Sequence, residues 1–135
     1  MVFAKETGDA LASLVKQIDK LVADNKDKKA ASFVNIIGED RDKLEETAKK
    51  FGESFENVAV VVPVEFELGP KDFGVSPDAG VTVMIYRGLK VEANHAIAPK
   101  KLDDKAIKAI MSTIPLLVRR LQHQLGARVL QVQNA

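Results

Sequence analysis

Short apolar runs alternate with a segment of helical periodicity in the first half of the chain, and this alternation most restricts the fold. Apolar side chains recur three and four positions apart over residues 11–22, which is the spacing of an amphipathic helix. Apolar runs at residues 1–4 and 30–37 flank this segment and predict short buried strands. A strand, a helix and a second strand of this kind favour a right-handed crossover between parallel strands. The sequence therefore predicts an α/β fold.

The middle of the chain extends this unit and then loses regular structure. A second helix is expected between Asp40 and Gly52. The run of valines in residues 57–64 predicts a strand covered on both faces, although Pro63 restricts it to a sheet edge or to the strand's end. Residues 65–80 contain several glycines and prolines, so we expect a loop with at most one short helical turn.

Two apolar segments after this loop predict an antiparallel hairpin. Residues 81–86 and 90–97 are joined by a tight connection at 87–89. The element order is then β-α-β-α-β-loop-β-β-α. Parallel crossovers followed by a hairpin predict a mixed five-stranded sheet with helices on both faces. We expect one domain over residues 1–126 and a C-terminal tail at 127–135.

The last helix is expected to begin at a cap on Asp103 or Asp104. Pro115 predicts a kink or a restart in its middle, because proline removes a backbone hydrogen bond. The apolar positions at 117–125 extend beyond what such a domain ordinarily covers. They favour either a homodimer or partner surface on this helix, or a segment that folds back onto the core.

The composition excludes several classes of function. The chain has no cysteine, which removes disulfides, thiolate metal ligands and thiol nucleophiles. His95 and His123 lie in different predicted elements, so we expect no metal and no cofactor. Twenty basic and nineteen acidic side chains leave a net charge of +1, which predicts neither a nucleic-acid nor a membrane partner. Without a long apolar run or a signal-peptide pattern, the expected location is the cytoplasm.

The first turn of the chain resembles the active-site turn of the thioredoxin superfamily, in the larger form used by peroxiredoxins and bacterial thiol-disulfide oxidoreductases. In that family a central strand ends in an apolar-aromatic-alanine stretch, and a Cys-x-x-Cys pair or a single peroxidatic cysteine opens the first helix two or three residues later. Here "VFA" at residues 2–4 matches the strand end. Thr7 and Ala10 stand at the places of the two cysteines, and Gly8 matches the glycine between them.

The start of the hairpin is the second point of resemblance, which spans residues 1–114 altogether. In the family a cis-proline followed by threonine opens this hairpin and faces the cysteine pair. Here Val81 and Thr82 open it, so the threonine is kept and the proline is absent. The resemblance implies a thioredoxin-like fold without thiol chemistry, because neither the Thr7 hydroxyl nor the Ala10 methyl group can exchange with a disulfide.

Two functions follow from this resemblance. The first is a redox-inactive module that binds a protein or peptide in the groove where family members hold extended chains, lined by Thr7, Gly8, Asp9, Ala10, Val81 and Thr82. The second is a fragment or subunit of a thiol-dependent redox protein whose cysteines lie upstream of Met1 or in a partner. A truncated chain of that kind is compatible with an extracytoplasmic location.

Three other sites have alternative interpretations. Thr7 and Asp9 either cap the first helix or form an anion site, and the charge of Asp9 favours the cap. His95 is either a general base or a solvated histidine on an edge strand, and the absence of a nearby partner in the sequence favours the second. Glu65 and Glu67 have two interpretations. They are either a carboxylate pair that does acid–base work or binds a hard cation, or solvated side chains at a strand end, and the second is favoured.

Overall fold

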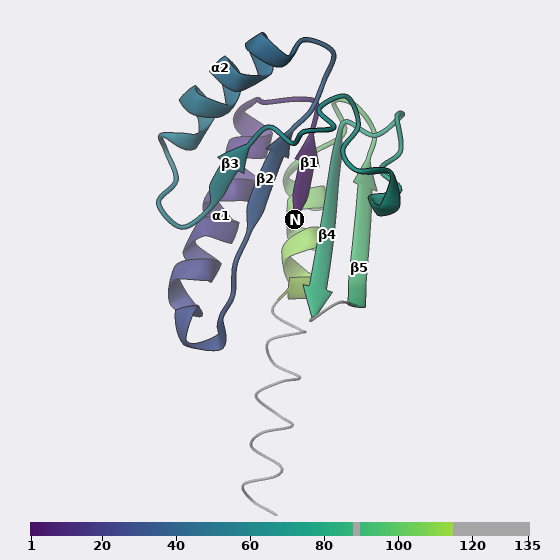
Figure 1. The fold of residues 1–135 in the computed structure, drawn as a ribbon. Coiled ribbons are helices and arrows are strands. Elements are labelled where there is room, and N and C mark those ends of the chain that lie inside the picture. Colours follow the sequence, from purple (N-terminus) through teal and green to yellow (C-terminus); the bar gives the residue numbers. More distant parts are fainter. Residues whose placement is uncertain (88–89, 115–135) are drawn as a thin grey trace, which may run out of the picture.

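The computed structural model of the protein describes residues 1–87 and 90–114 (Figure 1). A helix over residues 104–114 is the last described element, so the expected kink at Pro115 and the tail lie outside the described residues. The predicted order of elements is confirmed. The other elements are β1 (Val2–Ala4), α1 (Asp9–Asp24), the 3-10 helix η1 (Lys26–Lys28), β2 (Phe33–Ile36), α2 (Arg41–Gly52), β3 (Ala59–Val61), the 3-10 helix η2 (Lys71–Phe73), β4 (Val81–Arg87) and β5 (Lys90–Ile97).

The strands form one mixed five-stranded sheet in the order β3-β2-β1-β4-β5. β1 is parallel to β2, and β2 is parallel to β3. β4 is antiparallel to both β1 and β5. The mixed sheet predicted from the crossovers and the hairpin is therefore confirmed. Because β1 lies in the centre, all three of its residues are buried.

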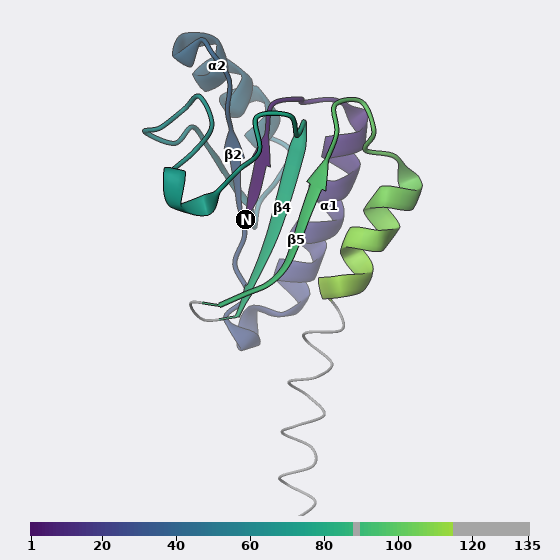
Figure 2. The same ribbon diagram turned by 90° about the vertical axis from the view of Figure 1, so that its right-hand side faces the viewer.

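One face of the sheet is covered by α1 and by the helix at residues 104–114, which lie on the same side of β4 and β5 (Figure 2). This last helix contributes Ile107 and Ile110 to the main hydrophobic core, and α2 contributes Ala48. The buried side chains of α1 are those at the three-and-four spacing of the sequence: Leu11, Leu14, Val15, Ile18 and Val22.

The other face of the sheet carries a smaller cluster, built around Phe3 and Met84. We expected helices on both faces, but this cluster is covered by the segment between β3 and β4, whose only helical turn is η2. Gly69 lets this segment approach closely. It has a positive φ of 81°, and a Cβ atom there would lie 2.7 Å from Cε1 of Phe3.

β3 lies at an edge of the sheet, and one of its faces is exposed. The prediction that both faces are covered is therefore wrong. Val60 packs against the main core, whereas Ala59 and Val61 are exposed on the opposite face. A run of valines resembles a fully buried strand, but alternate side chains of any strand point to opposite faces. The restriction that Pro63 places on this segment agrees with its position at the edge.

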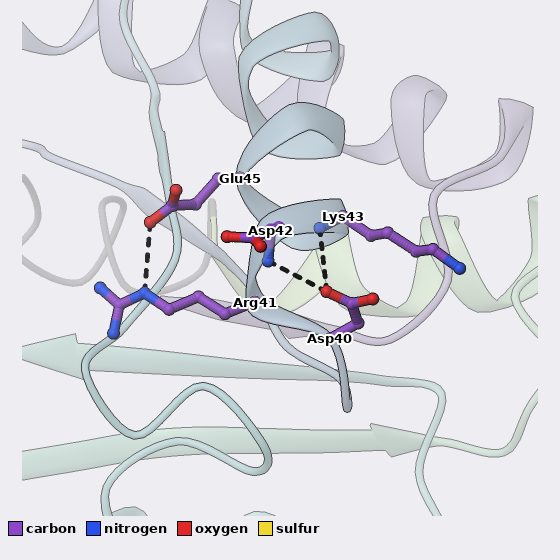
Figure 3. Close-up of polar contacts among 5 residues, drawn as sticks. All are labelled: Asp40, Arg41, Asp42, Lys43 and Glu45. Carbon is purple, nitrogen blue, oxygen red and sulfur yellow. Dashed lines mark hydrogen bonds and ion pairs between the residues drawn. The ribbon is translucent and has the colours of Figure 1, made fainter.

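Capping side chains start two of the helices. Oδ1 of Asp40 accepts hydrogen bonds from the backbone N–H groups of Asp42 at 3.1 Å and Lys43 at 3.4 Å (Figure 3). In the same way Oδ1 of Asp103 accepts the N–H of Ala106 at 2.8 Å, which confirms one of the two predicted caps of the last helix. These carboxylates satisfy amides that the helix itself leaves unpaired.

Candidate functional site

The first turn leaves the sheet directly beside the start of β4. In the antiparallel register of β1 and β4, Ala4 pairs with Val81 and Phe3 pairs with Thr82. The turn at residues 5–8 then leads into α1. The two segments that carry the sequence resemblance, the first turn and the start of the hairpin, are therefore neighbours in space.

The start of α1 is open to solvent. Thr7, Gly8 and Asp9 are exposed and Ala10 is half-buried. Gly8 is the N-cap residue and has an extended backbone, and no side chain accepts a hydrogen bond at this end of the helix. The prediction that Thr7 or Asp9 caps α1 is therefore wrong, because Thr7 lies before the cap position and Asp9 is already the first helical residue. Unlike α2 with Asp40, α1 offers its first amides to water or to a partner.

Val81 and Thr82 lie beneath this surface. Each is 2% exposed, so both side chains belong to the interior of the sheet and do not line a surface groove. Strand alternation directs Val81 to the face of the main core and Thr82 to the face that carries Phe3, and both faces are covered here. The hydroxyl oxygen of Thr82 is buried and has no hydrogen-bond partner among the described residues.

The backbone just before Val81 is already paired within the chain. The N–H of Gly80 donates to the carbonyl of Ile97 at 2.7 Å, and the carbonyl of Gly80 accepts the N–H of Lys5 at 2.8 Å. The sheet thus continues across Gly80, and the described chain contains no cis peptide bond. An extended peptide could not form backbone hydrogen bonds with Gly80, because its N–H and its carbonyl are both already paired.

The side chain of Glu6 and the turn at residues 98–101 fill the space in front of Gly80. Both carboxylate oxygens of Glu6 accept the backbone N–H of Lys100, at 3.1 and 3.0 Å. A Cβ atom at Gly80 would lie 2.9 Å from Cα of Pro99 and 3.0 Å from Oε2 of Glu6. This close packing shuts the part of the groove that lies between the first turn and the start of β4.

A hollow of about 370 Å³ remains open on the other side of the first turn, between α1 and α2. Its lining combines three hydroxyls, one ammonium group and two phenyl rings, whose centroids are 5.1 Å apart. A volume of this size suits a few side chains of a ligand. The lining residues are Thr7, Ala12, Thr47, Lys50, Phe51, Ser54 and Phe55.

The chemistry of this hollow suits binding better than catalysis. Hydroxyl groups need a neighbouring base to act as nucleophiles, and the lining includes no histidine or carboxylate. Sequence reasoning identified Thr7 and missed the residues of α2. The signal that could have found them is the pair of phenylalanines around the expected stop at Gly52, Phe51 in the helix and Phe55 after it, next to Lys50.

A second hollow, of about 530 Å³, lies within the segment between β3 and β4. Glu65 and Glu67 contribute to its lining, and both are exposed. Among residues 1–87 and 90–114, no three histidine, cysteine or acidic side chains are grouped in a way that could hold a metal ion. The two glutamates therefore stand as solvated carboxylates.

His95 has a structural partner. Its Nε2 atom lies 3.2 Å from Oγ1 of Thr113 in the last helix. That hydroxyl donates its own proton to the carbonyl of Ile110 at 2.6 Å, so it accepts the hydrogen bond from the imidazole. His95 does lie on an edge strand, as expected, but its side chain is half-buried and its hydrogen bond ties β5 to the last helix.

Comparisons with known proteins add no further assignment. Within the described part of the chain, no helix has the length and apolar character needed to cross a membrane. No protein-family model, curated protein or solved structure matches the chain.

Proposed function

We propose that the chain is a thioredoxin-like protein that carries out no thiol chemistry and binds another protein or a peptide. The architecture supports this assignment. β1 is central, runs parallel to β2 and antiparallel to β4, and leads into α1. The helix at 104–114 lies on the same face as α1 (Figure 2). The turn with Thr7 then occupies the place of the cysteine pair, beside the start of the hairpin strand.

The hollow between α1 and α2 is the observation that carries the binding proposal. Phe51 and Phe55 offer apolar surface for a ligand side chain. The uncapped start of α1 offers backbone donors, and the lining includes the Lys50 ammonium group, which pairs with Glu46 at 3.3 Å. A peptide that places an apolar side chain against the two rings and a backbone carbonyl group toward Thr7 would satisfy both parts of this surface.

The binding surface is accordingly displaced from the groove that the family resemblance implies. Glu6 and the turn at residues 98–101 close that groove at Gly80. Thr7 keeps its proposed role because it lines the hollow, and Gly8 and Asp9 follow it as exposed residues at the start of α1. Val81 and Thr82 support the first turn from below.

A peptide-display selection with a matched pair of variants tests this proposal. Peptides selected on the wild-type chain are labelled, and their affinities are measured by fluorescence polarisation against Ser54→Arg and Ser13→Arg. Ser54 lines the hollow, whereas Ser13 is an exposed serine on α1 that does not line it. We expect Ser54→Arg to weaken binding at least about tenfold, or about 1.4 kcal/mol, and Ser13→Arg to leave it unchanged. Peptides that bind both variants equally well, or a selection that yields no binder, would contradict the proposal.

A further inference from the structure

β3 presents outward backbone groups with which another strand can pair. The N–H of Ala59 donates toward the carbonyl of Ser32, so Ala59 faces β2. Because successive residues of a strand direct their backbone groups to alternate sides, the N–H and the carbonyl of Val60 point away from the sheet. Neither group has a hydrogen-bond partner among residues 1–87 and 90–114. These are the groups that an added strand would use.

The face of the sheet beside this edge is apolar. Val61 is 39% exposed and Phe33 of the neighbouring strand 47%. They point to the same face, because Phe33 pairs with Ala59 in the parallel register and Val61 is two residues further along. No charged residue lies between Glu56 and Glu65 in the sequence. Edge strands of natural proteins are usually covered or carry charges, so this edge lacks the ordinary protection.

Acidic side chains flank β3 along the chain. Glu53 and Glu56 precede it, and Glu65 and Glu67 follow it. All four are exposed, and none forms an ion pair with another described residue. Residues 26–29, which precede the neighbouring strand β2, carry three lysines and one aspartate, a net charge of +2 that balances the first two glutamates.

The end where β3 finishes keeps a negative charge. The basic group near it is the guanidinium of Arg41, which lies 5.9 Å from the centre of the Phe66 ring. This guanidinium already pairs with the carboxylate of Glu45 at 3.2 Å (Figure 3). Opposite charges on adjacent strands stabilise their pairing. A strand that suits this edge therefore carries a basic side chain at the end beside Glu65 and Glu67, and apolar side chains along the rest.

The chain itself contains a segment with this chemistry, outside the described residues. Residues 115–135 carry three arginines and no acidic side chain. Within them, residues 128–133 have the sequence RVLQVQ. In an extended chain Arg128, Leu130 and Val132 fall on one side, because alternate residues share a face. One basic residue followed by two apolar residues is the order that the edge requires.

We infer that residues 128–133 add to the sheet as a sixth strand, antiparallel to β3 of the same chain. The charges select this direction. An antiparallel strand places Arg128 beside Glu65 and Glu67, whereas a parallel strand would place it toward the lysines of residues 26–29.

The alternation of the strand then selects the register. With Arg128 next to the end of β3, Gln131 lies opposite Val60 and pairs with its outward N–H and carbonyl. Leu130 lies opposite Val61 and extends the apolar patch across the new edge. None of residues 59–64 lines the hollow beside Thr7, so the inference goes beyond the proposed function and does not depend on it.

The chain between the last helix and this strand is long enough to reach β3. Thirteen residues separate Ile114 from Arg128, and an extended chain of that length spans about 40 Å. Five strands at a spacing of about 4.8 Å, and the seven residues of β4, give the sheet a diagonal of about 30 Å. β5, at the other edge, begins with Lys90 and is followed by Lys100 and Lys101, which would repel an arginine.

An engineered disulfide tests the inference, because the wild-type chain has no cysteine. Val61→Cys and Leu130→Cys lie opposite each other in a non-hydrogen-bonded pair, whose Cα atoms are about 4.5 Å apart and within reach of a disulfide. The control combines Leu130→Cys with Val91→Cys at the other edge, where Val91 is 47% exposed. Oxidised glutathione should close the first pair within single chains at least about tenfold faster than the control pair. Equal rates, or disulfides that form only between chains, would overturn the inference.

Hydrogen exchange at the Val60 amide gives a second test. Arg128→Glu and Arg119→Glu each reverse one charge, but only Arg128 lies in the proposed strand. We expect the Val60 N–H to exchange at least about tenfold faster in Arg128→Glu than in the wild-type chain and at an unchanged rate in Arg119→Glu. Addition of Glu65→Arg to Arg128→Glu should restore part of the protection. Equal rates in the wild-type chain and Arg128→Glu, or an equal change in both variants, would contradict pairing with β3.

Discussion

The carboxylate of Glu6 holds the backbone N–H of Lys100 with both oxygens, at 3.1 and 3.0 Å, across 94 positions of the sequence. This contact connects the first turn to the turn after β5. It also places the carboxylate against Gly80, where an additional Cβ atom would collide with Pro99. The first turn is therefore fixed on the side of the hairpin and open on the side of α2.

Replacement of Glu6 should loosen this connection. We expect Glu6→Ala to lower the free energy of unfolding by about 1 kcal/mol, because the Lys100 N–H loses a charged acceptor at a partly solvated site. Glu6→Gln keeps one acceptor oxygen and should lose less. Urea denaturation of the two variants measures both effects. Equal stability of Glu6→Ala and the wild-type chain would contradict the role of this contact.

Removal of the buried Thr82 hydroxyl should stabilise the protein. Its oxygen has no partner among the described residues and the side chain is 2% exposed. Thr82→Val keeps the shape and removes the unpaired polar group, so we expect a gain of about 1 kcal/mol in thermal or urea unfolding. Thr82→Ser, which keeps the hydroxyl and loses a methyl group, should be less stable than the wild-type chain. A Thr82→Val variant less stable than wild type would show that the hydroxyl is satisfied.

Gly69 and Gly74 form a matched pair that separates backbone strain from a steric clash. Both have positive φ, at 81° and 62°. A Cβ atom at Gly74 meets nothing within 4 Å, whereas one at Gly69 would collide with the buried ring of Phe3. We expect Gly74→Ala to cost about 1 kcal/mol and Gly69→Ala at least about 2 kcal/mol more. Similar unfolding midpoints for the two variants would mean that the segment can move away from Phe3.

A free amino group at Met1 should make stability depend on pH. Burial lowers its pKa from 8.0 to about 6, although it donates to the carbonyl of Met84 at 2.7 Å. Between pH 6 and 8 the unfolded chain binds more protons than the folded chain, so stability should rise with pH across this window, by up to about 2.5 kcal/mol. Below pH 6 both states carry the charge, and this contribution is constant.

Acetylation of the Met1 amino group supplies the control for the pH measurement. An acetylated chain cannot titrate there, so the difference in unfolding free energy between the free and the acetylated chain should change between pH 6 and 8. A constant difference over this window would show that the amino group is solvated in the folded protein.

Local patterns predicted the elements well because their signals are short-range. The three-and-four spacing identified the buried face of α1, and the two runs around residues 87–89 identified the β4–β5 hairpin. The exposure of Val61 was missed because it depends on strand order, which brings β3 to the edge through contacts between distant segments. Pro63 was the one local feature of the sequence that indicated an edge position for β3.

The site was predicted only in part, for similar reasons. Thr7 could be identified because it follows the first strand directly, and it does line a hollow. The partners of Thr7 in α2 are about forty or more positions away in sequence, so no local spacing connects them. The closure of the groove at Gly80 depends on Glu6 meeting Lys100, a pairing that the sequence alone does not reveal.

Restoration of the cysteine pair tests the central claim, that the first turn occupies the active-site position of a thioredoxin-like fold. The variant carries Thr7→Cys and Ala10→Cys, and its control carries Glu39→Cys and Asp42→Cys, at the equivalent positions around the start of α2 (Figure 3 shows Asp42). Reduction of insulin disulfides by dithiothreitol is followed with each variant and with the wild-type chain. The account predicts that the first variant accelerates reduction, because its thiols lie at an open helix start beside the hairpin strand. No acceleration by that variant, or equal acceleration by the control, would contradict the claim.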